Sequence, residues 1–95
     1  MPAYVIAEID VTDPVLYERY KPLAAAAIAA GGGRYLVRGG ETAALEGAPP
    51  PGRVVVLEFP SVAAARAFYD GPDYAAARMI RERAATSRFF IVEGL

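Results

Sequence analysis

Apolar and polar positions alternate along short stretches of the chain that are typical of strands. In residues 3–10 every odd position is apolar, whereas the even positions include Glu8. This alternation predicts a strand with one buried face. Residues 34–38 and 88–92 are further short strand-like stretches, and residues 53–59 are almost continuously apolar, which favours a central strand buried on both faces. The pattern therefore predicts four strands.

A helix is predicted after the first strand. Asp13 is a suitable N-cap, and Pro14 suits the first helical position. We expect Pro22 to kink the helix or interrupt it for a turn, and the glycines of residues 31–33 to end it. Apolar residues that recur at helical spacing define its inner face. These residues are Leu16, Tyr20, Leu23, Ala24, Ala27 and Ile28.

Two shorter helices are predicted between the third and fourth strands. Ser61 is expected to cap the first, and Asp73 the second, which runs to about Ala84. The segment 70–72, Asp-Gly-Pro, separates them. The inner face of the first would hold Val62, Ala65, Phe68 and Tyr69.

The order strand–helix–strand occurs twice, with a weak sequence repeat between the halves. Residues 41–52, which contain three consecutive prolines, can only form a loop. The order predicts a single ferredoxin-like α+β domain over residues 1–95, with a four-stranded antiparallel sheet and helices on one face. The first and third strands would lie in the middle.

The other face of this sheet would remain open. By alternation it would carry Tyr4, Ile6, Glu8, Val54, Val56, Glu58, Arg34, Leu36 and Arg38. So much apolar surface is rarely left in water, and a second copy of the same face is the simplest cover. We therefore expect a homodimer.

Composition narrows the functions that the chain can have. The formal net charge is −1, which argues against nucleic-acid binding and gives no polybasic membrane patch. No run is long and apolar enough for a membrane span, and we expect a soluble cytoplasmic protein. Histidine and cysteine are absent, so we expect no metal site and no cofactor. Chemistry would have to use carboxylates, tyrosines, arginines, lysine or backbone groups.

Several motifs resemble one known family. They are Asp13-Pro14, the segment Gly32-Gly33-Arg34-Tyr35-Leu36-Val37-Arg38-Gly39-Gly40, Leu45-Glu46-Gly47, Glu58-Phe59-Pro60-Ser61, and Asp73-Tyr74 with Arg81 on one helix. In this order they resemble the family named domain of unknown function 1330. The resemblance implies a dimeric α+β barrel, in which two ferredoxin-like units pair their sheets. That superfamily includes cofactor-free monooxygenases, isomerases and ligand-sensing domains, so the resemblance does not choose a function.

Arginines and tyrosines are the candidate ligand-binding residues. Arg38 precedes two glycines, where backbone can approach a ligand closely, and its guanidinium could grip a carboxylate. Arg81 could point into a cleft beside the sheet and bind an anionic or aromatic ligand, together with Tyr20, Tyr69 and Tyr74. The structural alternative is an ion pair of Arg81 with Asp13 or Glu8.

Two carboxylates are weak catalytic candidates. Glu8 and Glu58 occupy matching places on the two central strands. Side by side on a buried face, one of them would hold its proton more tightly and could act as a general base. The alternative is that each pairs with an arginine across the sheet, as Arg34 would with Glu58.

Three functions remain open from the sequence. The first is a homodimer that binds a small molecule, with an aromatic or carboxylate-bearing metabolite favoured. The second is a cofactor-independent isomerase or monooxygenase, and the third is a structural dimer without a cavity.

Overall fold

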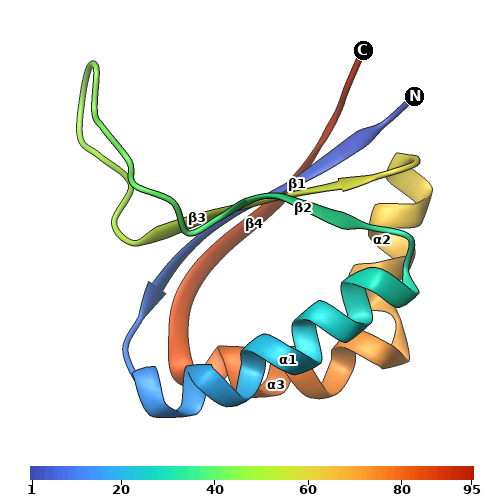
Figure 1. Cartoon of the computed structure of the whole chain (residues 1–95), viewed down its shortest axis with the longest axis horizontal. Helices are drawn as coiled ribbons and strands as arrows, with labels where there is room; N and C mark the ends of the chain where they lie inside the picture. Colours follow the sequence, from blue (N-terminus) through green and yellow to red (C-terminus); the bar gives the residue numbers. More distant parts are fainter.

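Four antiparallel strands form one sheet, and three helices pack against one of its faces (Figure 1). The computed structural model describes all 95 residues, Met1–Leu95. The elements are β1 (Ala3–Val11), α1 (Pro14–Ala30), β2 (Arg34–Arg38), β3 (Arg53–Phe59), α2 (Val62–Asp70), α3 (Pro72–Ala84) and β4 (Ala85–Glu93). The strands lie in the order β2-β3-β1-β4, which confirms the ferredoxin-like α+β fold with β1 and β3 in the middle.

The core lies between the sheet and the helices. The odd residues of β1 from Ala3 to Ile9 are buried, as are Val55, Leu57 and Phe59 of β3, whereas the residues between them are half-buried. Successive side chains of a strand point to opposite faces, so the half-buried set lines the face without helices. The central position of β3 in the sheet is confirmed. Its predicted burial on both faces is not seen within one chain, because helices cover only one face of the sheet.

A β-bulge interrupts the alternation of side chains along β2, which was predicted to be regular. Arg34 lies opposite Glu58, and Tyr35 opposite Leu57, as continuous pairing requires. The register then shifts between Tyr35 and Val37, so that Val37 lies opposite Val56 and Arg38 opposite Val55. An extra residue in one strand moves every later side chain to the other face. Arg38 therefore faces the helices and not the open face of the sheet.

Polar caps define the helix starts, with one correction. The carboxylate of Asp13 accepts from the backbone N–H of Leu16 at 3.1 Å. The hydroxyl of Ser61 accepts from the N–H of Ala64 at 3.0 Å. Asp73, however, lies inside the first turn of α3, and Gly71 is the cap. Pro72 takes the first helical position, which makes the residue before it the cap.

Helix α1 runs from Pro14 to Ala30 without the interruption that Pro22 predicted. Its buried residues are Tyr17, Tyr20, Ala24, Ala27 and Ile28. Leu23, which was predicted on the inner face, is 43 % exposed. The buried face of the helix therefore lies part of a turn away from the predicted one. The small alanines of the buried face let α1 pack closely on α3. The helix ends with Gly32 at φ +82°, a left-handed conformation that glycine adopts without strain.

The segment between β2 and β3 contains no helix or strand, as predicted for residues 41–52. It rises on the side of the sheet opposite the helices, as do both chain ends (Figure 1). The open face of the sheet is thus flanked by two projecting segments. None of the three helices is long and apolar enough to cross a membrane.

Gly52, at the start of β3, allows β1 and β3 to approach. A methyl group there would collide with the carbonyl oxygen of Ile9 and come 2.7 Å from the Cα of Asp10. We expect Gly52→Ala to lower the free energy of unfolding by about 1–3 kcal/mol, because backbone cannot yield as a side chain can. Urea denaturation would measure it. Gly40→Ala is the matched control, since nothing lies within 4 Å of its added methyl. Equal stability of the two variants would contradict this account of Gly52.

Candidate functional site

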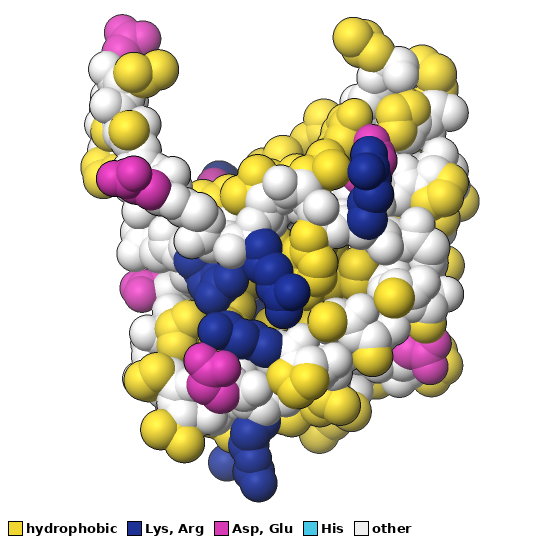
Figure 2. Space-filling view, in the orientation of Figure 1, with side chains coloured by type: hydrophobic (Ala, Val, Ile, Leu, Met, Phe, Trp, Pro, Cys, Tyr) yellow, Lys and Arg dark blue, Asp and Glu magenta, His cyan; other side chains and the backbone are white.

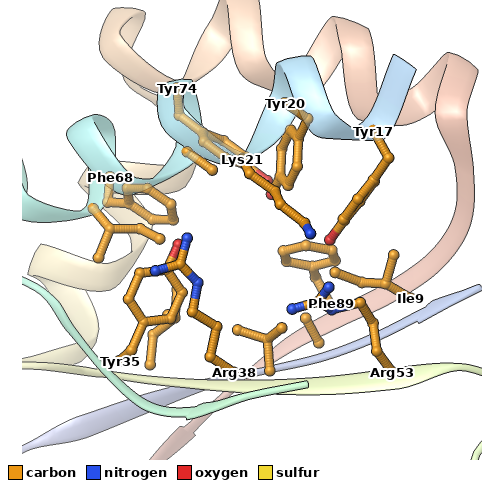
Figure 3. A pocket seen from close by; sticks show the side chains of 15 residues that line it. Ile9, Tyr17, Tyr20, Lys21, Tyr35, Arg38, Arg53, Phe68, Tyr74 and Phe89 are labelled. Atoms are coloured by element: carbon orange, nitrogen blue, oxygen red, sulfur yellow. The ribbon is translucent and has the colours of Figure 1, made fainter. Parts of the chain in front are cut away.

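A cleft opens between the sheet and the helices (Figure 3). About 30 Å³ of it is open to water-sized molecules, and about 430 Å³ is free when the open mouth is included. Of its 15 lining residues, 12 are hydrophobic or aromatic, and the other three are Lys21, Arg38 and Arg53. No acidic residue lines it. The cleft is therefore an apolar slot with a positive rim.

Two of the three cations have no carboxylate partner. Lys21 donates to Glu18 at 3.0 Å, but neither Arg38 nor Arg53 forms an ion pair. The guanidinium carbon of Arg38 lies 4.3 Å from the centroid of the Tyr35 ring. The Nε of Arg53 is buried without a partner. Figure 2 shows basic side chains gathered around a hollow with a hydrophobic floor.

Gly39 holds the end of β2 close to Arg53. A Cβ on Gly39 would come 2.7 Å from Nη2 of Arg53, and the residue has φ +72°. The sequence predicted that backbone here could approach a ligand. The structure shows that this glycine lies close to the Arg53 guanidinium, and its approach to a ligand stays a prediction.

Tyrosine hydroxyls form a buried chain on the helix side of the cleft. The hydroxyl oxygens of Tyr20 and Tyr74 lie 2.6 Å apart. Nη1 of Arg81 donates to the Tyr74 hydroxyl at 2.9 Å, and Nη2 donates to the Tyr69 hydroxyl at 3.5 Å. Arg81 and the three tyrosines predicted to act with it thus form one cluster. Of these four, Tyr20 and Tyr74 line the cleft.

Arg81 is the only charged residue that is fully buried, at 5 % exposed. The acidic partners predicted as the alternative are not there, because Asp13 caps α1 and Glu8 pairs with Arg88. Burial works to lower the pKa of Arg81, but the oxygens of Tyr74 and Tyr69 outweigh it and the pKa is raised. The cluster therefore holds a permanent positive charge behind the wall of the cleft.

Burial raises the pKa of both Tyr20 and Tyr74, and for Tyr20 the neighbouring Tyr74 adds to the effect. Burial also raises the pKa of Tyr17 and Tyr35. All four hydroxyls are thus protonated at neutral pH and can donate hydrogen bonds.

An alkaline titration should reveal this burial. Because folding raises the pKa of these tyrosine hydroxyls, their contribution to stability is complete at pH values below about 10, the ordinary pKa of tyrosine. The stability is lost as the pH rises above that value, since the unfolded chain then releases protons that the folded chain keeps. We expect Tyr17, Tyr20, Tyr35 and Tyr74 to ionise only together with unfolding, followed by absorbance of tyrosinate and by circular dichroism. Smooth ionisation of all tyrosines in the folded protein near pH 10 would contradict the burial.

The two candidate carboxylates lie on the open face of the sheet, away from the cleft. Glu8 lies opposite Val54 and Glu58 opposite Tyr4, so they are four residues apart and not neighbours as predicted. Each has an arginine partner: Arg88 donates to Glu8 at 2.7 Å, and Arg34 to Glu58 at 2.8 Å. These are the cross-strand pairs that the sequence offered as the alternative. A catalytic role of either carboxylate stays a prediction.

Sequence reasoning missed the four other lining residues with a charged or hydroxyl-bearing side chain, which are Lys21, Arg53, Tyr17 and Tyr35. Tyr17 and Lys21 are four residues apart, which places them on one face of a helix and was a usable signal. Arg53 and Tyr35 gave none, because their side depends on the register of the sheet. No group of three or more acidic, histidine or cysteine residues is arranged to hold a metal ion.

The fold and the cleft define a ferredoxin-like α+β protein with a cationic, aromatic-lined slot. The family model of the domain of unknown function DUF1330 matches residues 2–95. The chain therefore belongs to the DUF1330 family, as its motifs suggested. The comparison with curated proteins gives no match.

Solved structures share the fold at low sequence identity. A protein of unknown function from Rhodopseudomonas palustris is 22 % identical, with a TM-score of 0.76 over 99 % of this chain and 82 % of that one. A dimeric ferredoxin-like protein of unknown function from Thermobifida fusca is 20 % identical, with a TM-score of 0.69 over 99 % and 92 %. SnoaB, a cofactor-independent oxygenase from Streptomyces nogalater, is 14 % identical, with a TM-score of 0.65 over 99 % and 93 %.

Proposed function

We propose that the cleft binds a small, flat organic anion, and that an aromatic carboxylate is the chemical class it fits. One observation carries this proposal: the only non-hydrophobic residues of the lining are three cations, with no acid among them. Arg38 and Arg53 bring two guanidinium groups to the rim without any ion pair in the chain. Arg53 is half-buried, and a partly buried charge without a partner is costly. A ligand carboxylate would supply that partner.

The walls of the cleft favour an aromatic body for this ligand. Tyr17, Tyr35 and Phe89 line it together with aliphatic residues of the sheet. Aromatic rings stack or meet edge to face, and such pairs add to the free energy of burying apolar area. The Arg38 guanidinium already lies over the Tyr35 ring at 4.3 Å and could share a ligand ring in the same way.

Thermal unfolding with a panel of probes tests this function. The panel is benzoate and 1-naphthoate as aromatic anions, benzamide as a neutral analogue, and acetate as an anion without a ring, at constant ionic strength. At a hundred times Kd a ligand stabilises by about 2.7 kcal/mol, and Tm of a domain this small rises by about 10 °C. We expect a rise with the aromatic anions alone. Equal shifts with benzamide, or none with any anion, would overturn the proposal.

Native mass spectrometry of protein purified gently from its own host would then identify the natural ligand. A discrete extra mass, lost in the presence of excess 1-naphthoate, is the expected result. An extra mass that 1-naphthoate leaves in place would mean that the retained molecule occupies another site.

We further propose that the protein works as a homodimer joined through the open face of the sheet. Across the middle of this face runs an apolar row of Val37, Val56, Ile6 and Phe90, each paired with the next. The rows on either side each hold one ion pair, Arg34–Glu58 and Arg88–Glu8. An apolar stripe flanked by charges can match a second copy of itself about a twofold axis. The likeness in fold to a dimeric protein from Thermobifida fusca supports a dimer of this chain.

A cofactor-independent isomerase or monooxygenase is the second candidate function. The likeness to SnoaB, a cofactor-independent oxygenase, favours it. The test is turnover of a bound hydroxyaromatic compound by the purified protein, measured by oxygen uptake and by product mass. Oxygen uptake, or a product of unchanged mass and new structure, would support the enzyme over the binding protein. The third candidate is a structural dimer, which a closed barrel without a cavity would favour.

A further inference from the structure

The Tyr20–Tyr74 hydroxyl pair has a hydrogen-bond donor that nothing in the protein uses. Two phenolic hydroxyls have two protons, and their 2.6 Å contact takes up one of them. The only other partner of the pair is Arg81, which donates to Tyr74 and cannot accept. Tyr74 is 0 % and Tyr20 6 % exposed, so water meets neither freely. One buried O–H of the pair therefore has no acceptor within the protein.

Arg81 sets the direction of this chain of hydrogen bonds. The oxygen of Tyr74 accepts a hydrogen bond from the charged guanidinium, which polarises the O–H of Tyr74 and makes it the better donor to Tyr20. The unused proton is then that of Tyr20. Both tyrosines line the cleft, and Figure 3 shows them reaching into it from the helices while Arg38 rises from the sheet.

We propose that this pair donates its free hydrogen bond to an oxygen of the ligand, a carbonyl or phenolic oxygen remote from the carboxylate. The cleft would then hold a ligand with two polar ends: a carboxylate at Arg38 and Arg53, and an oxo or hydroxy group at Tyr20. The ligand class becomes an oxo- or hydroxy-substituted aromatic carboxylate. Arg81 is a positioning residue, because it acts on the ligand only through Tyr74.

A second observation supports a site for negative charge at this wall. The Nε of Arg81 is buried without a hydrogen-bond partner, and its guanidinium carbon lies 4.2 Å from the centroid of the Phe89 ring. Tyrosine oxygens and rings surround the cation, but no carboxylate neutralises it. A ligand oxygen that carries partial negative charge would be stabilised there in a medium of low dielectric.

Pairs of matched probes test this inference, which rests on the proposed function of the cleft. The probes are the three ring isomers of acetylbenzoate, each paired with the isopropylbenzoate that has the same shape without the acceptor. For at least one isomer we expect the acetyl compound to bind roughly tenfold tighter in calorimetry. Tyr20→Phe should abolish the preference yet keep binding of the isopropyl compound. Tyr4→Phe, on the open face, should keep the preference.

The outcomes separate the two proposals. Equal binding of both compounds for every isomer would overturn the donor site and leave the anion site standing. Failure of every benzoate to bind would overturn both.

Because Arg81 acts on the ligand only through Tyr74, its positioning role is tested by a measurement other than binding affinity. The infrared carbonyl stretch of bound acetylbenzoate should lie at lower frequency in the native protein than in Arg81→Met, and Arg81→Lys should restore part of the shift. An unchanged stretch in Arg81→Met would show that Arg81 is only structural. If Arg81→Met does not fold, the stretch in Tyr20→Phe decides the proposal, since loss of the hydrogen bond must raise the frequency.

Discussion

Replacing Arg38 and Arg53 together by glutamine is expected to weaken binding of an aromatic carboxylate about a hundredfold. A hydrogen bond to a charged group contributes about 1.5–3 kcal/mol, and loss of the lower value at both arginines, about 3 kcal/mol in total, weakens Kd roughly a hundredfold. Isothermal titration with 1-naphthoate would measure the change. Added salt should weaken binding to the native protein more than to the variant, because the rim of the cleft is open to ions.

A double variant with the same change of net charge is the control. Arg66→Gln with Arg83→Gln removes two exposed charges on α2 and α3 that lie outside the cleft lining. We expect this control to bind 1-naphthoate like the native protein. If both double variants lose the same affinity, the effect comes from net charge and not from the cleft, and the proposed anion site is wrong.

Ile6→Lys is expected to convert the proposed dimer into a monomer. Ile6 lies between Val56 and Phe90, in the middle of the apolar row on the open face. A twofold interface would bury two such lysines, one from each copy, and an unpaired buried charge costs several kcal/mol. Light scattering after gel filtration should give a mass near 10.1 kDa for the variant and twice that for the native protein.

The matched control is Leu23→Lys, which places the same charge at a leucine on α1 that is 43 % exposed. This variant should remain dimeric, because α1 covers the other face of the sheet. A dimeric Ile6→Lys protein would show that the copies meet through another surface. A native protein that is itself monomeric at micromolar concentration would refute the dimer.

The elements of the fold were predictable because their signals are local. Alternation identified β1, and β2 and β3 were predicted with the bounds observed. Asp13 and Ser61 cap their helices as predicted, since a side-chain oxygen has only to reach an N–H three residues further on. Asp73 was misassigned because both it and the residue before Pro72 can start a helix. Leu23 was misassigned because an alanine-rich helix has no sharp apolar stripe.

The cleft was only partly predictable. Arg38, Tyr20 and Tyr74 were recognised as candidates, and all three line it. Arg38 was expected on the wrong face, however, because the bulge between Tyr35 and Val37 leaves no mark in the sequence that alternation can detect. Arg53 was missed for a related reason. Nothing local indicates that Gly39, from the next strand, will pack against its guanidinium.

By itself, the amino-acid sequence determined the family, the order of the elements and the residue types available for chemistry. It could do so because strand alternation, helix caps and the absence of histidine and cysteine depend only on neighbours along the chain or on composition. The tertiary structure alone decided which side of the sheet Arg38 faces and that Arg81 meets Tyr74 and not a carboxylate. Those facts depend on strand register and on helix packing between residues far apart in the chain, and a single shift in register reverses them.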